Sequence, residues 1–116
     1  TPASPSPSLL ASLFALVSRD WAACGASIRA ATYSPLVMQL QQLLPVQNDA
    51  PAPSVLVPGA GLGRMAYEMY RVGYSVQACE MDPLLVTCMD WLLNHVEEPV
   101  MCAPHLHLFR HNVHGD

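Results

Sequence analysis

Three glycines and one acid stand at spacings that suit the binding of a small ligand. Gly59, Gly61 and Gly63 follow a short apolar run and precede an amphipathic one. Glycine adopts positive φ angles and has no side chain to hold a ligand away from the backbone, and the helix that follows such a turn offers free N–H groups. Glu80 follows Gly59 by 21 residues, at the end of the next apolar run. The pattern predicts a backbone cradle with a carboxylate beside it.

The spacing of the glycines indicates which ligand the cradle takes. The dinucleotide fingerprint is G-x-G-x-x-G, and Arg64 stands where its third glycine would be, which disfavours NAD. G-x-G-x-G followed by an acid at the end of the next strand is the arrangement of proteins that bind S-adenosylmethionine (SAM). A carboxylate at Glu80 can accept hydrogen bonds from both ribose hydroxyls. Each feature also has an interpretation without a ligand. In that interpretation the glycines serve only a tight strand-to-helix connection, and Glu80 is an acid exposed to solvent.

The elements around the turn predict a parallel α/β sheet. Residues 54–57 form a short β-branched and apolar run, which predicts a buried strand that ends at Pro58. Apolar residues then recur at spacings of three and four as far as about Val72, which predicts a helix, and residues 74–80 predict a second strand. A strand–helix–strand unit is right-handed and parallel by default. We therefore expect a doubly wound α/β sheet that binds its ligand at the carboxyl ends of these strands.

Further helices and one weaker strand are expected on either side of this unit. Residues 9–17 carry an apolar helical stripe. Ser34 is expected to be the N-cap of a helix that runs to Leu44, and Asp82 the N-cap of a helix that follows the second strand. Residues 105–109 alternate weakly and predict a third strand. We expect residues 1–8 to be a flexible Pro/Ser leader, 9–53 a helical segment with a linker, and 54–116 the first half of a SAM-binding Rossmann-like domain.

Composition excludes several classes of protein. The chain has 116 residues, is 52% hydrophobic and 12% charged, and carries a net charge of −4, whereas disordered chains are poor in apolar residues and rich in charge. Its basic residues are five arginines without a lysine, so no basic stripe for nucleic acid or a polybasic membrane anchor is present. The apolar run 9–17 is too short to span a bilayer. We expect neither nucleic acid nor a membrane as partner.

The cysteines and histidines do not form a metal or disulfide pattern. Four cysteines lie far apart, without a C-x-x-C pair (Cys24, Cys79, Cys88 and Cys102), which favours a reducing compartment, cytoplasmic or also nuclear. Cys79 and Cys88 stand among apolar residues and are expected to be buried. A metal site is one reading of the C-terminal histidines (His105, His107, His111 and His114), but no single helix or strand aligns three of them. A polar loop or edge segment is favoured there.

Three other side chains have both a binding and a structural interpretation. Arg64 either faces the ligand or pairs with Glu68 one helical turn away, and we favour the ion pair. Trp21 and Trp91 are expected in the core rather than as stacking platforms for a ligand.

The sequence around the glycine turn resembles the carnosine N-methyltransferase family. The string V-L-V-P-G-A-G-L-G-R spans residues 55–64, and Arg19-Asp20-Trp21 matches an R-D-W motif of the family. Further matches lie on both sides of the turn (Gly25, Arg29, Tyr33, Pro35, Ala66, Glu68, Gly73, Tyr74, Glu80 and Asn94). The resemblance covers about residues 13–97. Leu16 and the pair Ala78-Cys79 depart from the family, which has Gln and Gly-Asn there.

The resemblance implies a Rossmann-like SAM-dependent methyltransferase fold, here truncated to its first two or three strands with N-terminal helices. It implies methyl transfer from SAM to the imidazole nitrogen of carnosine or a related histidine-containing dipeptide. By the same resemblance Gly59 and Glu80 hold the cofactor, and Arg19 reaches it, where a guanidinium suits the methionine carboxylate. The substrate-contacting residues of the family lie in its second half, so no catalytic residue is assigned.

The expected protein is therefore a fragment or short isoform of such an enzyme. The alternative is a non-catalytic SAM-binding or interaction module that lacks the substrate half. Because a sheet of two or three strands leaves an edge unpaired, self-association through that edge is a further expectation.

Overall fold

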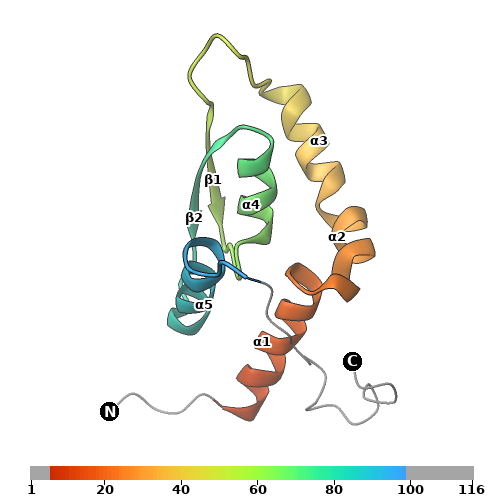
Figure 1. Ribbon diagram of the computed structural model, residues 1–116, viewed down its shortest axis with the longest axis vertical. Coiled ribbons are helices and arrows are strands. Elements are labelled where there is room, and N and C mark those ends of the chain that lie inside the picture. Colours follow the sequence, from red (N-terminus) through yellow and green to blue (C-terminus); the bar gives the residue numbers. More distant parts are fainter. Residues whose placement is uncertain (1–5, 99–116) are drawn as a thin grey trace.

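The structure is a computed structural model that describes residues 6–98 (Figure 1). Helices precede and follow a two-stranded sheet in the chain. The element order is α1 (Pro7–Asp20), η1 (Ala23–Gly25), α2 (Ala26–Thr32), α3 (Ser34–Leu43), β1 (Ser54–Pro58), α4 (Arg64–Arg71), β2 (Ser75–Cys79) and α5 (Pro83–Asn94). This is a mixed α/β arrangement of the kind expected for part of a methyltransferase fold. The predicted division at residues 8 and 53 stays a prediction.

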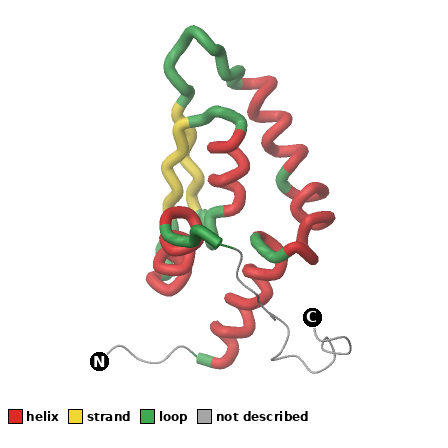
Figure 2. Tube along the Cα trace, in the orientation of Figure 1, coloured by secondary structure: helices red, strands yellow, loops and turns green. Residues whose placement is uncertain are grey.

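The two strands are parallel, and α4 connects them. Val55 pairs with Val76, and the register continues to Pro58 opposite Cys79. The strand–helix–strand prediction is therefore confirmed within the described residues, each boundary falling within two residues of expectation. The expected strand at 105–109 and the four C-terminal histidines lie outside the described residues. Figure 2 shows the two strands side by side, with α4 along one side of them.

Only one face of the sheet is covered by the described elements. Val76 and Ala78 are partly buried and share a hollow with residues of α4 and α5. On the opposite face Leu56 is 60% exposed. Cys79 also points to this open face and is exposed, so the expectation that it is buried is wrong. Successive strand residues point to opposite faces, and Cys79 falls on the uncovered one. Cys88, on α5, is partly buried, and this burial raises the pKa of its thiol.

The N-terminal helices extend further than the sequence predicts. The helix α1 begins at Pro7 because Ser6 caps it, accepting a hydrogen bond of 3.1 Å from the backbone N–H of Leu9. The helix α2 was not expected at all. It turns into α3 at Tyr33, which keeps a helical conformation and serves as the N-cap of α3 without a side-chain hydrogen bond. The prediction of Ser34 as N-cap is wrong, because Ser34 is already the first helical residue.

The helices α2 and α3 lie beside α4 on the side away from the strands, and α1 lies below α4 in the view of Figure 1. The hydroxyl of the buried Tyr74 donates a hydrogen bond of 2.6 Å to the carbonyl of Leu44, which ties the end of α3 to the start of β2. Among the described residues, no single helix is long and apolar enough to cross a membrane. The pair 7–20 and 23–32, bent by 69°, has that length and composition when taken together.

The helix α5 begins where the sequence predicts. The carboxylate of Asp82 accepts hydrogen bonds from the N–H groups of Leu84 and Leu85, at 2.9 and 3.4 Å. This N-cap prediction is confirmed. Met89 on α5 is buried against the glycine turn, whereas Trp91 is 48% exposed, so the expectation of a core position for Trp91 is wrong among the described residues.

Candidate functional site

The glycine turn has the backbone that the sequence predicts. Gly59, Gly61 and Gly63 have φ angles of 62°, 59° and 82°. These left-handed conformations cost a residue with a β-carbon about 1–2 kcal/mol each. Three of them within five residues turn the chain sharply from the end of β1 into the start of α4, so this turn needs glycine for its conformation alone.

The three glycines differ in what surrounds them. A β-carbon on Gly63 would come within 2.8 Å of Cγ of Met89, so this glycine lets α5 pack directly on the turn. A β-carbon on Gly59 or Gly61 would meet no described atom within 4 Å. Internal packing therefore explains the third glycine and not the first two. The bare backbone of Gly59 and Gly61 faces open space, where a ligand could contact it.

The acid after β2 reaches this turn. Oε1 of Glu80 accepts a hydrogen bond of 3.0 Å from the N–H of Gly61. Its Oε2 accepts two more, from the N–H groups of Met81 and Asp82, at 2.8 and 2.9 Å. The hydrogen bonds from Asp82, Gly61 and Met81 lower the pKa of Glu80 below its usual value, so the side chain is a carboxylate at neutral pH.

Backbone bonds hold the two strand ends together around this carboxylate. The N–H of Ala60 donates to the carbonyl of Cys79 at 2.9 Å, which continues the strand pairing into the turn. A carboxylate has about four acceptor positions, and three of those on Glu80 are filled by N–H groups. One position, on Oε1, receives no hydrogen bond from residues 6–98 and is open to a further donor. The structure thus brings Gly61 and Glu80 together at the carboxyl ends of the strands.

The third predicted cofactor residue lies near the end of α1. Nε and Nη2 of Arg19 donate to the two oxygens of Asp20 at 2.7 and 3.0 Å. Asp20 is 2% exposed and also accepts a hydrogen bond of 2.7 Å from the hydroxyl of Tyr33. The Arg19 side chain is 43% exposed. Its hydrogen bonds with Asp20 raise its pKa further, so it is always a cation.

Trp21 connects this arginine to the glycine turn. Its indole N–H donates a hydrogen bond of 3.0 Å to the carbonyl of Leu62, which is fully buried. Arg19 therefore lies two positions before a residue that hydrogen-bonds to the turn. No hydrogen bond or ion pair joins Arg19 to Gly59, Gly61 or Glu80 among the described residues.

Arg64 takes the structural role that the sequence favours. Its Nη2 lies 2.7 Å from Oε1 of Glu68, one helical turn away, and its guanidinium lies 5.0 Å from the ring centre of Trp21 and 5.2 Å from that of Tyr67. The predicted ion pair is confirmed. Sequence reasoning missed that Trp21 is a link between elements rather than a simple core residue. It also missed that Asp20 and Tyr33 fix the direction of Arg19, because their contact depends on how α1 and α2 fold together.

A matching sequence profile covers nearly the whole chain. The profile of the family described as carnosine N-methyltransferase matches residues 4–116. The chain belongs to this family. Carnosine N-methyltransferase from Rattus norvegicus is 33% identical over 97 residues, which are 81% of this chain and 24% of the relative. Carnosine N-methyltransferase from Schizosaccharomyces pombe is 32% identical over 103 residues, 86% of this chain and 28% of the relative. Carnosine N-methyltransferase unmet from Drosophila melanogaster is 30% identical over 101 residues, 84% of this chain and 22% of the relative.

Membership of the carnosine N-methyltransferase family confirms the resemblance that the residues indicated. The chain spans about a quarter of the length of these relatives. It corresponds to a part of a methyltransferase that contains the glycine turn, the acid after β2 and the helices that precede them.

Proposed function

We propose that this chain supplies the cofactor-binding part of a SAM-dependent methyltransferase. The reaction proposed is transfer of a methyl group to the imidazole nitrogen of carnosine or a related histidine-containing dipeptide, in the cytoplasm or also the nucleus. The hydrogen bond between Gly61 and Glu80 carries the proposal. It sets a carboxylate with one open acceptor position beside two glycines whose backbone faces open space. The acceptor comes from the family relationship alone.

The residues of the turn fit the nucleoside part of SAM. Gly59 and Gly61 let the ligand lie against the backbone, and the open position on Oε1 of Glu80 would accept a ribose hydroxyl hydrogen. Because backbone N–H groups already fix this carboxylate, it would need no rearrangement to bind.

Arg19 fits the amino-acid part of the cofactor. Nε and Nη2 are engaged by Asp20, which leaves the Nη1 end of the guanidinium free among the contacts of the described residues. Arginine can use two edges of its fork, so Arg19 would bind the methionine carboxylate while Asp20 holds it from the side. Asp20 and Tyr33 would therefore position Arg19 rather than touch the cofactor.

SAM would supply an electrophilic methyl group on a sulfonium sulfur, which a neutral imidazole nitrogen can accept in line. What this chain's residues contribute is binding and orientation, which lower the entropic part of the barrier. Backbone donors hold three of the roughly four acceptor positions of Glu80, so we assign this carboxylate to binding and not to general base catalysis.

Calorimetric titration of the chain with S-adenosylhomocysteine, with NAD as the control ligand, tests the cofactor proposal. We expect binding of S-adenosylhomocysteine alone, and about tenfold weaker binding by Glu80→Gln, which loses the charge but keeps one acceptor oxygen. Glu97→Gln removes an exposed acid outside the site and should bind as the unmodified chain does. Equal binding by the unmodified chain and Glu80→Gln would show that the Glu80 carboxylate does not contribute to cofactor binding.

A second function is a SAM-binding or interaction module without catalysis. The observation in its favour is that the described residues bring the glycine turn and a carboxylate together, which serves binding, while none of them is assigned to the methyl acceptor. An assay of methyl transfer to carnosine separates the two proposals. Cofactor binding with transfer supports the enzyme, and cofactor binding without transfer supports the module.

A further inference from the structure

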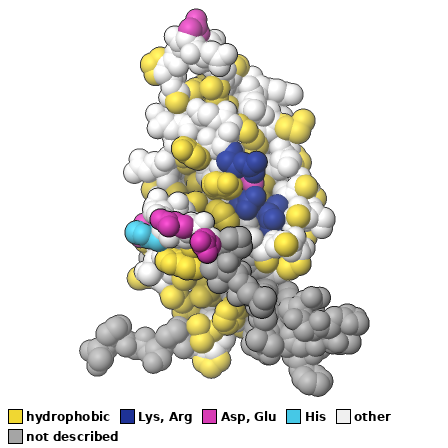
Figure 3. All heavy atoms as spheres, in the orientation of Figure 1, with side chains coloured by type: hydrophobic (Ala, Val, Ile, Leu, Met, Phe, Trp, Pro, Cys, Tyr) yellow, Lys and Arg dark blue, Asp and Glu magenta, His cyan; other side chains and the backbone are white. Residues whose placement is uncertain are grey.

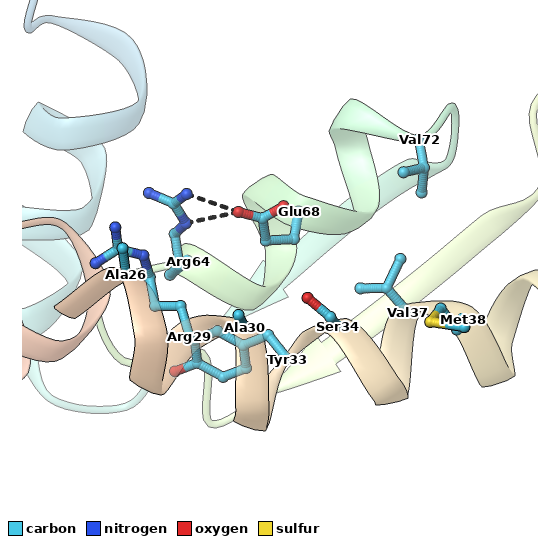
Figure 4. Close-up of a pocket in the computed structure, with 10 residues that line it drawn as sticks. All are labelled: Ala26, Arg29, Ala30, Tyr33, Ser34, Val37, Met38, Arg64, Glu68 and Val72. Atoms are coloured by element: carbon cyan, nitrogen blue, oxygen red, sulfur yellow. Dashed lines mark hydrogen bonds and ion pairs between the residues drawn. The ribbon is translucent and has the colours of Figure 1, made fainter. Parts of the chain in front are cut away.

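A second concave site lies on the other side of α4 from the strands. Its cavity of about 390 Å³ is formed between α2, α3 and α4 (Figure 4). The residues that line it and carry the argument are Arg29, Arg64, Glu68, Val37, Met38 and Val72. None of Gly59, Gly61, Glu80 and Arg19 lines it, so it is separate from the proposed cofactor site.

The cavity has a charged end and an apolar end. In Figure 4 the guanidinium groups of Arg29 and Arg64 lie toward one end, beside each other, and Val37, Met38 and Val72 lie at the other. This division suits a ligand that has one charged group and an apolar chain.

Arg29 is held in place without being neutralised. Its Nη1 donates to the carbonyls of Arg19 and Ala22, at 3.0 and 2.7 Å. Carbonyl oxygens orient the guanidinium but cancel none of its charge. Within residues 6–98 neither Nε nor Nη2 of Arg29 has a hydrogen-bond partner, which leaves donors for a ligand.

Arg64 adds a second fixed cation. Its side chain is only 15% exposed, and it lies against the rings of Trp21 and Tyr67. Its partner Glu68 is shared with Arg71, at 3.5 Å. Two arginines, Arg29 and Arg64, and one carboxylate, Glu68, therefore line the cavity, a local excess of one positive charge in a chain whose net charge is −4. Figure 3 shows dark blue side chains gathered next to a magenta one on this face of the molecule.

The wall that carries Arg29 also has small residues. Ala26, Ala30 and Ser34 follow one another at spacings of four along α2 and the start of α3, and all three line the cavity. Because these side chains are short, they leave space between α2 and α4 for a ligand.

We propose that this cavity binds a small organic acid, a carboxylate or phosphate monoester on an apolar chain. Partly dehydrated guanidinium groups bind such oxyanions through paired, charge-assisted hydrogen bonds. The oxyanion would sit between Arg29 and Arg64, and the apolar chain would lie on Val37, Met38 and Val72. This site is independent of the proposed cofactor site.

Titration of the full chain with four probes tests the ligand class. Hexanoate and hexyl phosphate carry the anion and the chain, hexanol has the chain alone, and inorganic phosphate has the anion alone. We expect at least one of the two hexyl anions to bind about tenfold more tightly than hexanol and than inorganic phosphate. The stronger of the two identifies the head group. Failure of both hexyl anions to bind, or equal binding of hexanol, overturns the proposal.

A substitution that supplies an internal anion locates the site. Ala30→Asp places a carboxylate on the cavity wall next to Arg29 on α2 and should weaken the binding of the preferred hexyl anion about tenfold. Ala31→Asp, on the same helix and likewise exposed but outside the cavity, matches its helix propensity and net charge and should bind as the unmodified chain does. Equal loss in both variants, or loss in neither, overturns the assignment to this cavity.

Discussion

The side chain of Glu80 accepts a hydrogen bond from the backbone N–H of Gly61 at 3.0 Å. The two residues are 19 positions apart in sequence, and each belongs to the carboxyl end of a different strand. The bond therefore makes one unit of the glycine turn and the acid. Loss of the acid affects both the fold of the turn and the binding of any ligand there.

The stability contributed by Glu80 should depend on pH. Backbone donors lower its folded-state pKa below the usual 4.5. The contribution is therefore present above pH 4.5 and is lost as the pH falls through the folded-state pKa. We expect Glu80→Gln to lower the free energy of unfolding at pH 7 and to make little difference at pH 2. Urea denaturation of both chains at the two pH values measures this, and a difference that grows toward low pH would contradict it.

Alanine at Gly63 should destabilise the chain more than alanine at Gly61. Both substitutions place a β-carbon at a positive φ, but only that on Gly63 comes within 2.8 Å of Met89. Overpacking of this kind costs about 1–3 kcal/mol, and this is the expected difference between the variants. Chemical denaturation measures it. Because Met89→Ala itself removes a buried side chain, the clash is measured as coupling: Gly63→Ala should cost less in the Met89→Ala chain than in the unmodified chain, and an equal cost would show that the clash is not with Met89.

Removal of Arg19 should lower the free energy of unfolding more than removal of the charge on Asp20. Arg19→Ala leaves Asp20, which is 2% exposed, as a buried charge with only the Tyr33 hydroxyl, and we expect a loss of about 3 kcal/mol. Asp20→Asn leaves Arg19, whose side chain is 43% exposed and stays hydrated, and should cost about 1–2 kcal/mol. Urea denaturation compares the two. The reverse order would mean that Asp20 is solvated in solution.

Tyr33 should make the chain sensitive to alkali. Burial, and then its hydrogen bond to Asp20, raise its pKa from 10.0 to about 12. Its contribution to stability is complete below pH 10 and is lost as the pH rises through 12, because the unfolded tyrosine ionises first. We expect the free energy of unfolding to fall as the pH rises from 10 to 12. Tyr33→Phe should lower it at pH 8 and remove part of this fall, and an unchanged alkaline slope would contradict the assignment.

The sequence by itself determined the local elements around the turn. Gly59, Gly61 and Gly63 have positive φ angles, which other residues adopt only at a cost in free energy. The residue types alone therefore predict the turn. Apolar spacing predicted α4, α5 and both strands, and the short side chain of Asp82 marked a helix start. The Arg64–Glu68 ion pair could be predicted because residues four apart lie side by side on any helix. In each case the determining interactions lie within a few residues.

Only the tertiary structure decided which side chains meet across the elements and which are exposed. Cys79 and Trp91 were expected inside and are exposed, because apolar character does not say which face of a strand or helix another element covers. Tyr33 keeps a helical backbone between α2 and α3, so the capping residue expected at Ser34 became part of the helix. Asp20 is buried under Arg19 and Tyr33, and the cavity with Arg29 and Arg64 lies between helices that are distant in sequence. Such contacts depend on the packing of whole elements, which no local pattern encodes.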